Sequence, residues 1–224
     1  MIGIIIQARM GSTRLPGKVL KKIGPKTLLA HILYRLEFLK TSATLVVATG
    51  DSSTDNPVQR FCAENGVRCF RGSEANVLER YYLCAKQYGF SDVVRMTGDN
   101  PFPDIEELDR LIRLYKTSDA DFCHSFKSLP IGVGAEIFSI AALARSYREG
   151  KAQHHVEHVD EYILEHPELF KTSELEVDKT KNRPDVRLTV DTDEDYRRAC
   201  FIVGNARGEF VSTLEAIELC SHFA

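Results

Sequence analysis

Long apolar runs, a signal peptide and paired cysteines are all missing from this 224-residue sequence. No apolar stretch approaches the roughly 20 residues that a membrane-spanning helix needs. Met1 leads directly into a strand-like run with no basic segment before it, so we expect no secretory signal peptide. The six cysteines form no CxxC pair and show no regular spacing: Cys62, Cys69, Cys84, Cys123, Cys200 and Cys220. This usage favours reduced thiols in a cytoplasmic protein over a disulfide framework or a zinc site.

Acidic residues are also missing from the first 36 positions, which hold seven Lys and Arg before the first acid, Glu37. The whole chain has 29 basic and 32 acidic residues and a net charge of −3, which argues against general nucleic-acid binding. The rest of the chain therefore holds 22 basic against 32 acidic residues. This asymmetry predicts an anionic ligand at the N-terminal end. A solvated basic loop is the alternative.

Apolar runs of strand length alternate with segments of helical periodicity. The continuous run over 2–8 is typical of a buried parallel strand, and Thr27 is placed to cap the helix that follows it. We expect strands at 2–8, 44–49, 67–70, 92–98, 120–126 and 186–190, and helices at 28–39, 56–65, 74–88, 104–116, 139–149 and 153–165. This alternation predicts an α/β fold with a mostly parallel, doubly wound sheet flanked by helices.

The length and composition fit one soluble globular domain, with 43% hydrophobic and 27% charged residues. The alternating pattern loosens after the strand at 120–126, where 128–135 reads as a loop and 171–188 is polar and mixed. We therefore expect a single domain over residues 1–224 with an excursion from the core at about 128–180.

The stretch "QARMGSTRLPGKVL" follows the first predicted strand and resembles a P-loop without being one. From Gly11 its pattern is G-x5-G-K-V, which is one residue too long and lacks the Ser or Thr that would ligate magnesium. A GxGxxG fingerprint is absent as well. What remains is a loop in which Gly11, Ser12 and Gly17 free backbone N–H groups. Its cations are Arg9, Arg14 and Lys18. Such a loop at the carboxyl end of a parallel strand predicts a triphosphate-binding site of non-Walker type.

Two aspartates follow predicted strands: Asp99 in "TGDNP" and Asp191 in "VDTDED". Carboxylates at strand ends, approached by phosphate-binding cations, supply the hard oxygen ligands of a Mg²⁺–nucleotide site. The alternatives are a turn or helix-capping role for Asp99 and a helix start for the acids from Asp191 to Asp195.

Two other motif matches are rejected. Asp191, Asp193 and Asp195 imitate the start of an EF-hand, but Tyr196 replaces its glycine and Ile202 its bidentate Glu. "HHVEH" at 154–158 matches the H-x-x-E-H pattern of a class of zinc proteases, yet no third zinc ligand can be identified. We interpret 154–158 as one helix face.

Five segments together resemble one family: "QARMGSTRLPGKVL", "FRGSEANVLERYY", "RMTGDNPFPD", "HHVEHVDEYILEHPELF" and "RLTVDTDEDY". The chain is similar to the cytidylyltransferases of the spore-coat polysaccharide biosynthesis protein F family. These are related to CMP-3-deoxy-manno-octulosonate synthetase and the acylneuraminate cytidylyltransferases. The resemblance covers nearly the whole chain. Gln7 departs from it, because the octulosonate and neuraminate enzymes usually have Pro there.

The resemblance implies a Rossmann-like nucleotide-diphospho-sugar transferase fold and a Mg²⁺-dependent reaction. CTP and an acidic sugar would give a CMP-sugar and pyrophosphate, in a cytoplasmic homodimer. Arg9 and Lys18 would bind the triphosphate, and the backbone from Ala8 to Ser12 would line the nucleotide. Asp99 and Asp191 would hold magnesium. Arg71 and Ser73, in "FRGSE", lie where relatives recognise the base.

Glu136 and His155 are weaker candidates for sugar contacts, with a surface strand acid and a helix-face histidine as their alternatives. Two rival functions also stay open. The first is a glycosyltransferase of the same fold that uses Asp191-x-Asp193 as a metal motif and a nucleotide-sugar as donor. The second is a non-catalytic nucleotide-binding subunit, against which the pair of Asp99 and Asp191 argues.

Overall fold

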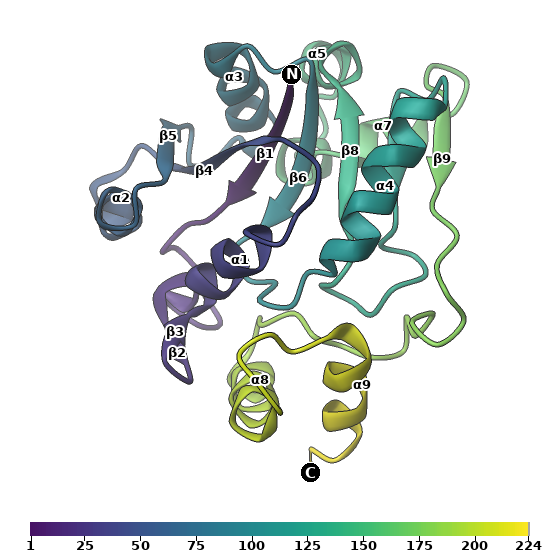
Figure 1. Cartoon of the computed structure of the whole chain (residues 1–224). Coiled ribbons are helices and arrows are strands. Elements are labelled where there is room, and N and C mark those ends of the chain that lie inside the picture. Colours follow the sequence, from purple (N-terminus) through teal and green to yellow (C-terminus); the bar gives the residue numbers. More distant parts are fainter. Residues whose placement is uncertain (224) are drawn as a thin grey trace.

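The central sheet has seven strands in the order β5-β4-β1-β6-β8-β7-β9 in the computed structural model, which describes residues 1–223 (Figure 1). Strand β1 lies near the middle and pairs in parallel with β4 on one side and β6 on the other. Strand β8 is antiparallel to both β6 and β7, whereas β5 and β9 add parallel edges. The strands are β1 (Ile2–Gln7), β4 (Thr44–Gly50), β5 (Arg68–Gly72), β6 (Asp92–Thr97), β7 (Phe122–His124), β8 (Glu136–Ser139) and β9 (Thr172–Glu174). The predicted α/β fold with a mostly parallel sheet is confirmed.

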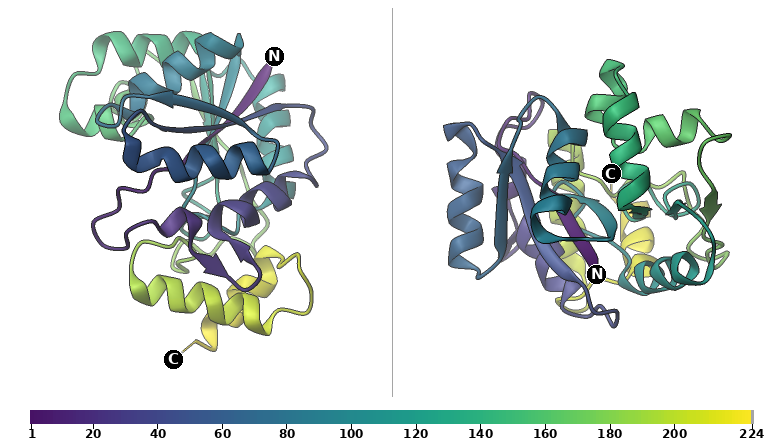
Figure 2. Two further views of the ribbon diagram at one scale, coloured as in Figure 1. Left: turned by 90° about the vertical axis from the view of Figure 1, so that its left-hand side faces the viewer. Right: turned by 90° about the horizontal axis from the view of Figure 1, so that it is seen from above.

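Helices cover both faces of the sheet (Figure 2), which explains why β1 reads as an uninterrupted apolar run. Ile4 and Ile6 pack with α1, α2 and α4 on one face. Ile5 packs with α3, α5 and α7 on the other. The helices are α1 (Leu28–Leu36), α2 (Asn56–Glu64), α3 (Val77–Tyr88), α4 (Ile105–Thr117), α5 (Ile140–Glu149), α6 (Gln153–Glu157) and α7 (Glu161–Glu165). A short turn of 3₁₀ helix (Ser53–Asp55) precedes α2.

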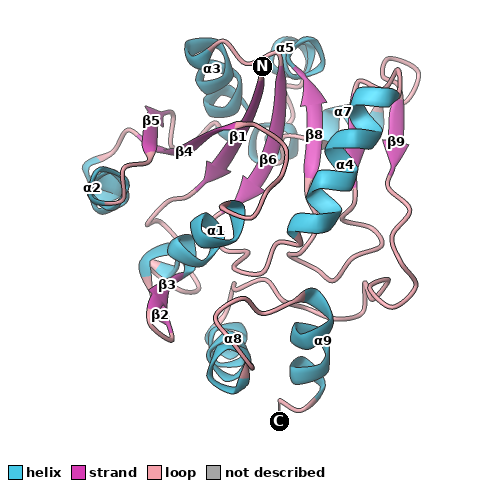
Figure 3. Cartoon of the chain, in the orientation of Figure 1, coloured by secondary structure: helices cyan, strands magenta, loops and turns pink. Residues whose placement is uncertain are grey.

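A third apolar cluster lies beyond the carboxyl ends of β1 and β6, toward which their arrowheads point (Figure 3). It joins α8 (Asp193–Asn205) and α9 (Thr213–Ser221) to a hairpin of β2 (Lys22–Ile23) and β3 (Lys26–Thr27). Leu15 and Ile23 pack against Val190 and Ile202 in this cluster. The loop after β1 is therefore fixed between the sheet and the C-terminal helices.

Helix starts are the local features that the sequence predicts best. The Thr27 hydroxyl accepts a hydrogen bond from Ala30 N and caps α1, as predicted. The Asp104 carboxylate accepts from Glu107 N and caps α4. Both caps pair a backbone N–H that has no partner within its own helix, which is why these residue types signal helix starts.

Two local predictions are wrong, and two strands were missed. Residues 186–190 are not a strand, because only Arg187 makes an isolated bridge, with Ile131. The helix expected over 153–165 is two short helices, α6 and α7, interrupted at 158–160. The missed strands are β8 and β9, which lie within the predicted excursion at 128–180. The description of 1–224 as one domain with an excursion stays a prediction.

Candidate active site

The loop after β1 is closed by its own backbone. Gly17 has a positive φ of 67° and donates its N–H to Met10 O at 3.0 Å, and Ser12 N donates to the same oxygen at 2.9 Å. The prediction that the N–H groups of Ser12 and Gly17 are free is therefore wrong. A positive φ is a conformation that glycine adopts without steric cost. The Ser12 hydroxyl accepts from Leu15 N at 3.3 Å, and Leu15 is buried in the third apolar cluster. A turn of 3₁₀ helix (Lys18–Leu20) follows directly, so Lys18 begins a fixed element.

Lys18 lies between the two predicted metal ligands. Its Nζ donates to Asp99 Oδ2 at 2.7 Å and to Asp191 Oδ1 at 2.8 Å, and its side chain is only 11% exposed. The two aspartates meet because Val190 N donates to Asp99 O at 2.9 Å. This single backbone hydrogen bond brings Asp99 and Asp191 together, which a strand at 186–190 was expected to do. The structure places Lys18, Asp99 and Asp191 side by side.

Arg187 holds Asp191 from the other side, and the sequence reasoning missed it. Its Nη2 donates to Asp191 Oδ2 at 2.5 Å, and its Nε donates to Asp195 Oδ1 at 3.1 Å. Burial raises the pKa of Asp191, but Lys18 and Arg187 outweigh it, and the pKa lies below its ordinary value. Each carboxylate oxygen of Asp191 therefore accepts a hydrogen bond from a cation, Oδ1 from Lys18 and Oδ2 from Arg187.

Thr192 is the N-cap of α8, and Asp195 lies in the first turn of that helix. Asp195 forms a capping box with Thr192 and accepts the N–H of Asp191 at 3.1 Å. Burial raises the pKa of Asp195, but Arg187 and the backbone N–H groups outweigh burial and lower this pKa to about 2. The helix-start interpretation of the acidic stretch is thus confirmed for Asp195. Asp193 is 72% exposed and pairs with Arg197 at 3.5 Å.

A cavity of about 570 Å³ opens above these groups. Six polar residues predicted at the site line it: Arg9, Ser12, Arg14, Lys18, Asp99 and Asp191, together with Gly11. Arg14 Nη2 lies 3.5 Å from Asp191 Oδ1, and Arg9 Nη2 donates to Glu157 Oε1 at 2.9 Å. Asp193 does not line this cavity. Ala8 also lies outside the lining, because it is buried and its N–H extends the sheet to Ala48 O at 3.1 Å.

Arg71 and Ser73, predicted near the base, do not line the cavity either. The Arg71 guanidinium donates to Gly50 O, Ser52 O and the side chains of Asn56 and Gln59. It therefore fixes the loop between β4 and α2. The Ser73 hydroxyl accepts from Asn76 N at 3.0 Å, at the start of α3.

Glu136 and His155 also lie outside the cavity lining. Glu136 is buried, so its interpretation as a surface acid is wrong. Burial raises its pKa to about 8, although it accepts from Arg95 Nη1 at 2.7 Å. His155 is bonded to Glu165 at 2.6 Å through Nε2.

Arg95, Glu157 and His158 line the cavity, whereas the two residues predicted to contact a sugar do not. Arg95 had a signal in the sequence: it is the one charge inside the apolar run "VVRM" of a predicted buried strand. Glu157 and His158 belong to the rejected zinc motif, and the structure separates its members. His154 bonds Glu165, whereas Glu157 bonds Arg9.

Asp99 and Asp191 fit a divalent cation. Their oxygens converge on one positive charge, the Lys18 ammonium, and carboxylate oxygens are the hard ligands that Mg²⁺ prefers. Oδ1 of Asp99 has no protein partner within residues 1–223 and is open to a further ligand. A metal held by this pair requires Lys18 to turn away from the two carboxylates.

The chain is similar to several known proteins. Residues 3–219 match the family model described as cytidylyltransferase. The chain is 39% identical over 197 residues to the spore coat polysaccharide biosynthesis protein SpsF of Bacillus subtilis, covering 86% of this chain and 82% of that protein. An 8-amino-3,8-dideoxy-manno-octulosonate cytidylyltransferase of Shewanella amazonensis is 28% identical over 125 residues, 54% of this chain and 50% of that protein. The structure of a cytidylyltransferase from Leptospira borgpetersenii superposes with a TM-score of 0.91 at 34% identity, covering 99% of this chain and 94% of that one.

Proposed function

The chain belongs to the cytidylyltransferase family, and we propose that it joins CMP to an acidic sugar, using CTP and releasing pyrophosphate, for surface polysaccharide or glycan biosynthesis. The convergence of Lys18, Asp99 and Asp191 beside the basic loop is the observation that carries this proposal. The acidic sugar is supported by the octulosonate named for one relative, and the polysaccharide by the name of another.

The basic loop would bind the triphosphate. Gly11 and Ser12 line the cavity together with Arg9 and Lys18, and the two cations are donors suited to phosphate oxygens. Lys18 would exchange its aspartate partners for these oxygens, and Arg9 would exchange Glu157. Both cations would then stabilise the negative charge of the departing pyrophosphate, which forms as the sugar hydroxyl attacks the α-phosphorus in line.

Asp99 and Asp191 would hold Mg²⁺, with Arg187 orienting Asp191. When bound, Mg²⁺ neutralises charge on the α-phosphate and makes the sugar hydroxyl a better nucleophile. Arg187 keeps one carboxylate oxygen of Asp191 occupied, so the other points into the cavity toward Lys18.

Sugar contacts would come from the far side of the cavity. We propose that Glu136 acts through Arg95, which it holds at the cavity wall. His155 would act through α6, which carries Glu157 into the cavity wall beside His158. Arg71 and Ser73 would support base recognition by fixing the loops before α2 and α3. The active form is proposed to be a cytoplasmic homodimer, as the resemblance of the sequence implies.

Pyrophosphate release tests this proposal against a glycosyltransferase. The protein is incubated with Mg²⁺, each of the four common nucleoside triphosphates and a panel of acidic and neutral sugars. We expect pyrophosphate only with CTP and an acidic sugar. Sugar transfer from a nucleotide-sugar donor without pyrophosphate would favour the rival function. That rival has no support from Asp193, which lies outside the cavity lining.

Within residues 1–223, no helix combines the length and the apolar character needed to cross a membrane.

A further inference from the structure

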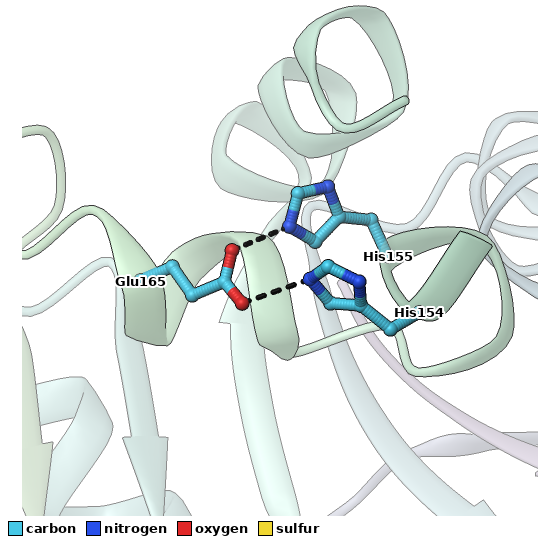
Figure 4. Close-up of side chains that lie close together, drawn as sticks. All are labelled: His154, His155 and Glu165. Atoms are coloured by element: carbon cyan, nitrogen blue, oxygen red, sulfur yellow. Dashed lines mark hydrogen bonds and ion pairs between the residues drawn. The ribbon is translucent and has the colours of Figure 1, made fainter. Parts of the chain in front are cut away.

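Two histidines and a glutamate meet at the junction of α6 and α7, away from the cavity lining (Figure 4). His154 Nε2 lies 2.8 Å from Glu165 Oε1, and His155 Nε2 lies 2.6 Å from Glu165 Oε2. The ligand atoms of all three residues lie within 4.8 Å of one another. One carboxylate is therefore held by two imidazoles from successive residues.

This convergence is not what a helix produces by default. Successive helical residues point about 100° apart, because 3.6 residues complete a turn. The two rings nevertheless lie with centroids 4.1 Å apart, at an angle of 62°. The His155 side chain is only 9% exposed and its ring packs edge-on against Tyr162 at 5.3 Å. One imidazole is thus held in place by the protein, facing a carboxylate that a second imidazole also reaches.

We propose that His154, His155 and Glu165 form a binding site for a transition-metal dication of the Zn²⁺ type, separate from the oxygen site of Asp99 and Asp191. Imidazole nitrogen and carboxylate oxygen are ligands that Zn²⁺ takes, and a water can complete the tetrahedron. Mg²⁺ prefers oxygen ligands alone. The two sites of this chain therefore select different metals.

The distances require only a small opening of the cluster. Ligand atoms about 2.1 Å from a tetrahedral zinc lie roughly 3.4 Å from one another. The present hydrogen-bond distances are 2.8 and 2.6 Å, so each pair must separate by roughly 0.7 Å. His154 and Glu165 are 48% and 44% exposed and have room to make this shift, and the same exposure gives an ion a path of entry.

The surroundings of His155 limit the affinity of this site for Zn²⁺. A metal-binding histidine ordinarily donates its second ring N–H to a carboxylate or carbonyl, and loss of such a partner costs about 10–100-fold in affinity. His155 Nδ1 is buried and has no hydrogen-bond partner within residues 1–223. We therefore expect a micromolar dissociation constant for Zn²⁺.

Occupancy would stiffen one wall of the cavity. Helix α6 continues from His155 to Glu157, which bonds Arg9, and His158 follows in the cavity lining. A metal that ties α6 to α7 would hold this wall against the nucleotide loop. Because the three ligands converge only in the folded chain, Zn²⁺ binding should also raise the melting temperature.

The test uses tag-free, chelator-treated full-length protein and Zn²⁺ alone, so that it does not depend on the proposed reaction. Zn²⁺ affinity is measured by competition with a chromogenic chelator, for wild type and for Glu165→Gln and His154→Asn. His222→Gln is the matched control, because His222 is also an exposed histidine near the end of a helix. Circular dichroism confirms that each variant is folded.

We expect one Zn²⁺ per chain in the wild type and in His222→Gln, at least tenfold weaker binding in the other two variants, and no displacement by millimolar Mg²⁺. Co²⁺ in place of Zn²⁺ should give tetrahedral absorption bands without the near-ultraviolet charge transfer of thiolate ligands. Equal affinity in all four proteins, binding weaker than 100 µM in the wild type, or a thiolate spectrum would each overturn the proposal.

Discussion

Lys18→Ala should have opposite effects on the two ligands of the active site. The Lys18 ammonium occupies the space between Asp99 Oδ2 and Asp191 Oδ1 in the nucleotide-free protein. The ammonium would strengthen the binding of a nucleotide, since the Lys18 side chain would turn to the phosphates. The ammonium weakens the binding of a divalent cation, because it competes for the same carboxylate oxygens.

The structure sets the size of both effects. Hydrogen bonds to charged groups contribute about 1.5–3 kcal/mol each, and Lys18 makes two of them with a side chain that is 11% exposed. Loss of one such contact to the triphosphate should weaken CTP binding at least tenfold, or about 1.4 kcal/mol. Release of the two aspartates should strengthen binding of Mg²⁺ or Mn²⁺ without nucleotide, by about tenfold. Arg187 stays on Asp191 in the variant and limits this gain.

Titration calorimetry measures both affinities on the same protein samples. CTP is titrated without metal, and Mn²⁺ is titrated without nucleotide. Lys22→Ala is the matched control, because Lys22 is an exposed lysine of the same basic segment that does not line the cavity. Unchanged CTP binding in Lys18→Ala would refute the assignment of the loop. Weakened binding of both ligands would show that the variant has lost the structure of the site.

Three further predictions concern the metal pair, acid stability and assembly. Asp99→Asn and Asp191→Asn should each abolish most pyrophosphate release, and the double variant should lose little more than the worse single one, since residues that act as a unit are non-additive. Full activity in Asp191→Asn would contradict the metal assignment. Asp195 should contribute about 2 kcal/mol to stability above its ordinary pKa of 3.8, and lose this as the pH falls through about 2, because its folded-state pKa is depressed. Urea unfolding from pH 2 to 6 should therefore show a steeper acid loss in wild type than in Asp195→Asn; parallel curves would count against it. Light scattering should give a dimer at micromolar concentration, and a monomer would oppose the proposed assembly.

The opening loop could be predicted because its chemistry is local. The glycines and cations follow a buried strand directly, so their place at the carboxyl edge of the sheet could be read from the sequence. The same locality explains the correct cap at Thr27, whose hydroxyl pairs with an N–H three residues away. Asp99 was placed at the same sheet edge for a related reason, since it lies two residues after the end of β6 at Thr97.

Asp191 was found by reasoning that was partly wrong. Residues 186–190 are apolar enough to suggest a strand, but they pack into the third apolar cluster beside α8 and pair with the sheet region only through Ile131 and Asp99. The sequence could not show that Arg187 would hold Asp191, because an arginine between apolar residues has no preferred partner until the chain is folded. Asp99 and Asp191 meet through tertiary contacts rather than through a shared sheet.

The residues on the far side of the cavity could not be predicted from local sequence patterns. Glu136 and Arg95 lie on neighbouring antiparallel strands, and strand β8 itself was not predicted. Glu157 and His158 line the cavity, whereas His155 faces Glu165 of α7. A continuous helical pattern over 153–165 conceals the break between α6 and α7, so it could not show which of these residues would line the cavity.

The central claim is that this chain transfers the α-phosphorus of CTP to a sugar. CTP labelled with ³²P at the α position and, separately, at the γ position is incubated with Mg²⁺ and an acidic sugar such as an octulosonate, and the products are separated. The account predicts α label in a CMP-sugar and γ label in pyrophosphate, both lost in Asp191→Asn. Label that stays in CTP with every acidic sugar of the panel, or α label that leaves only as free CMP, would contradict it.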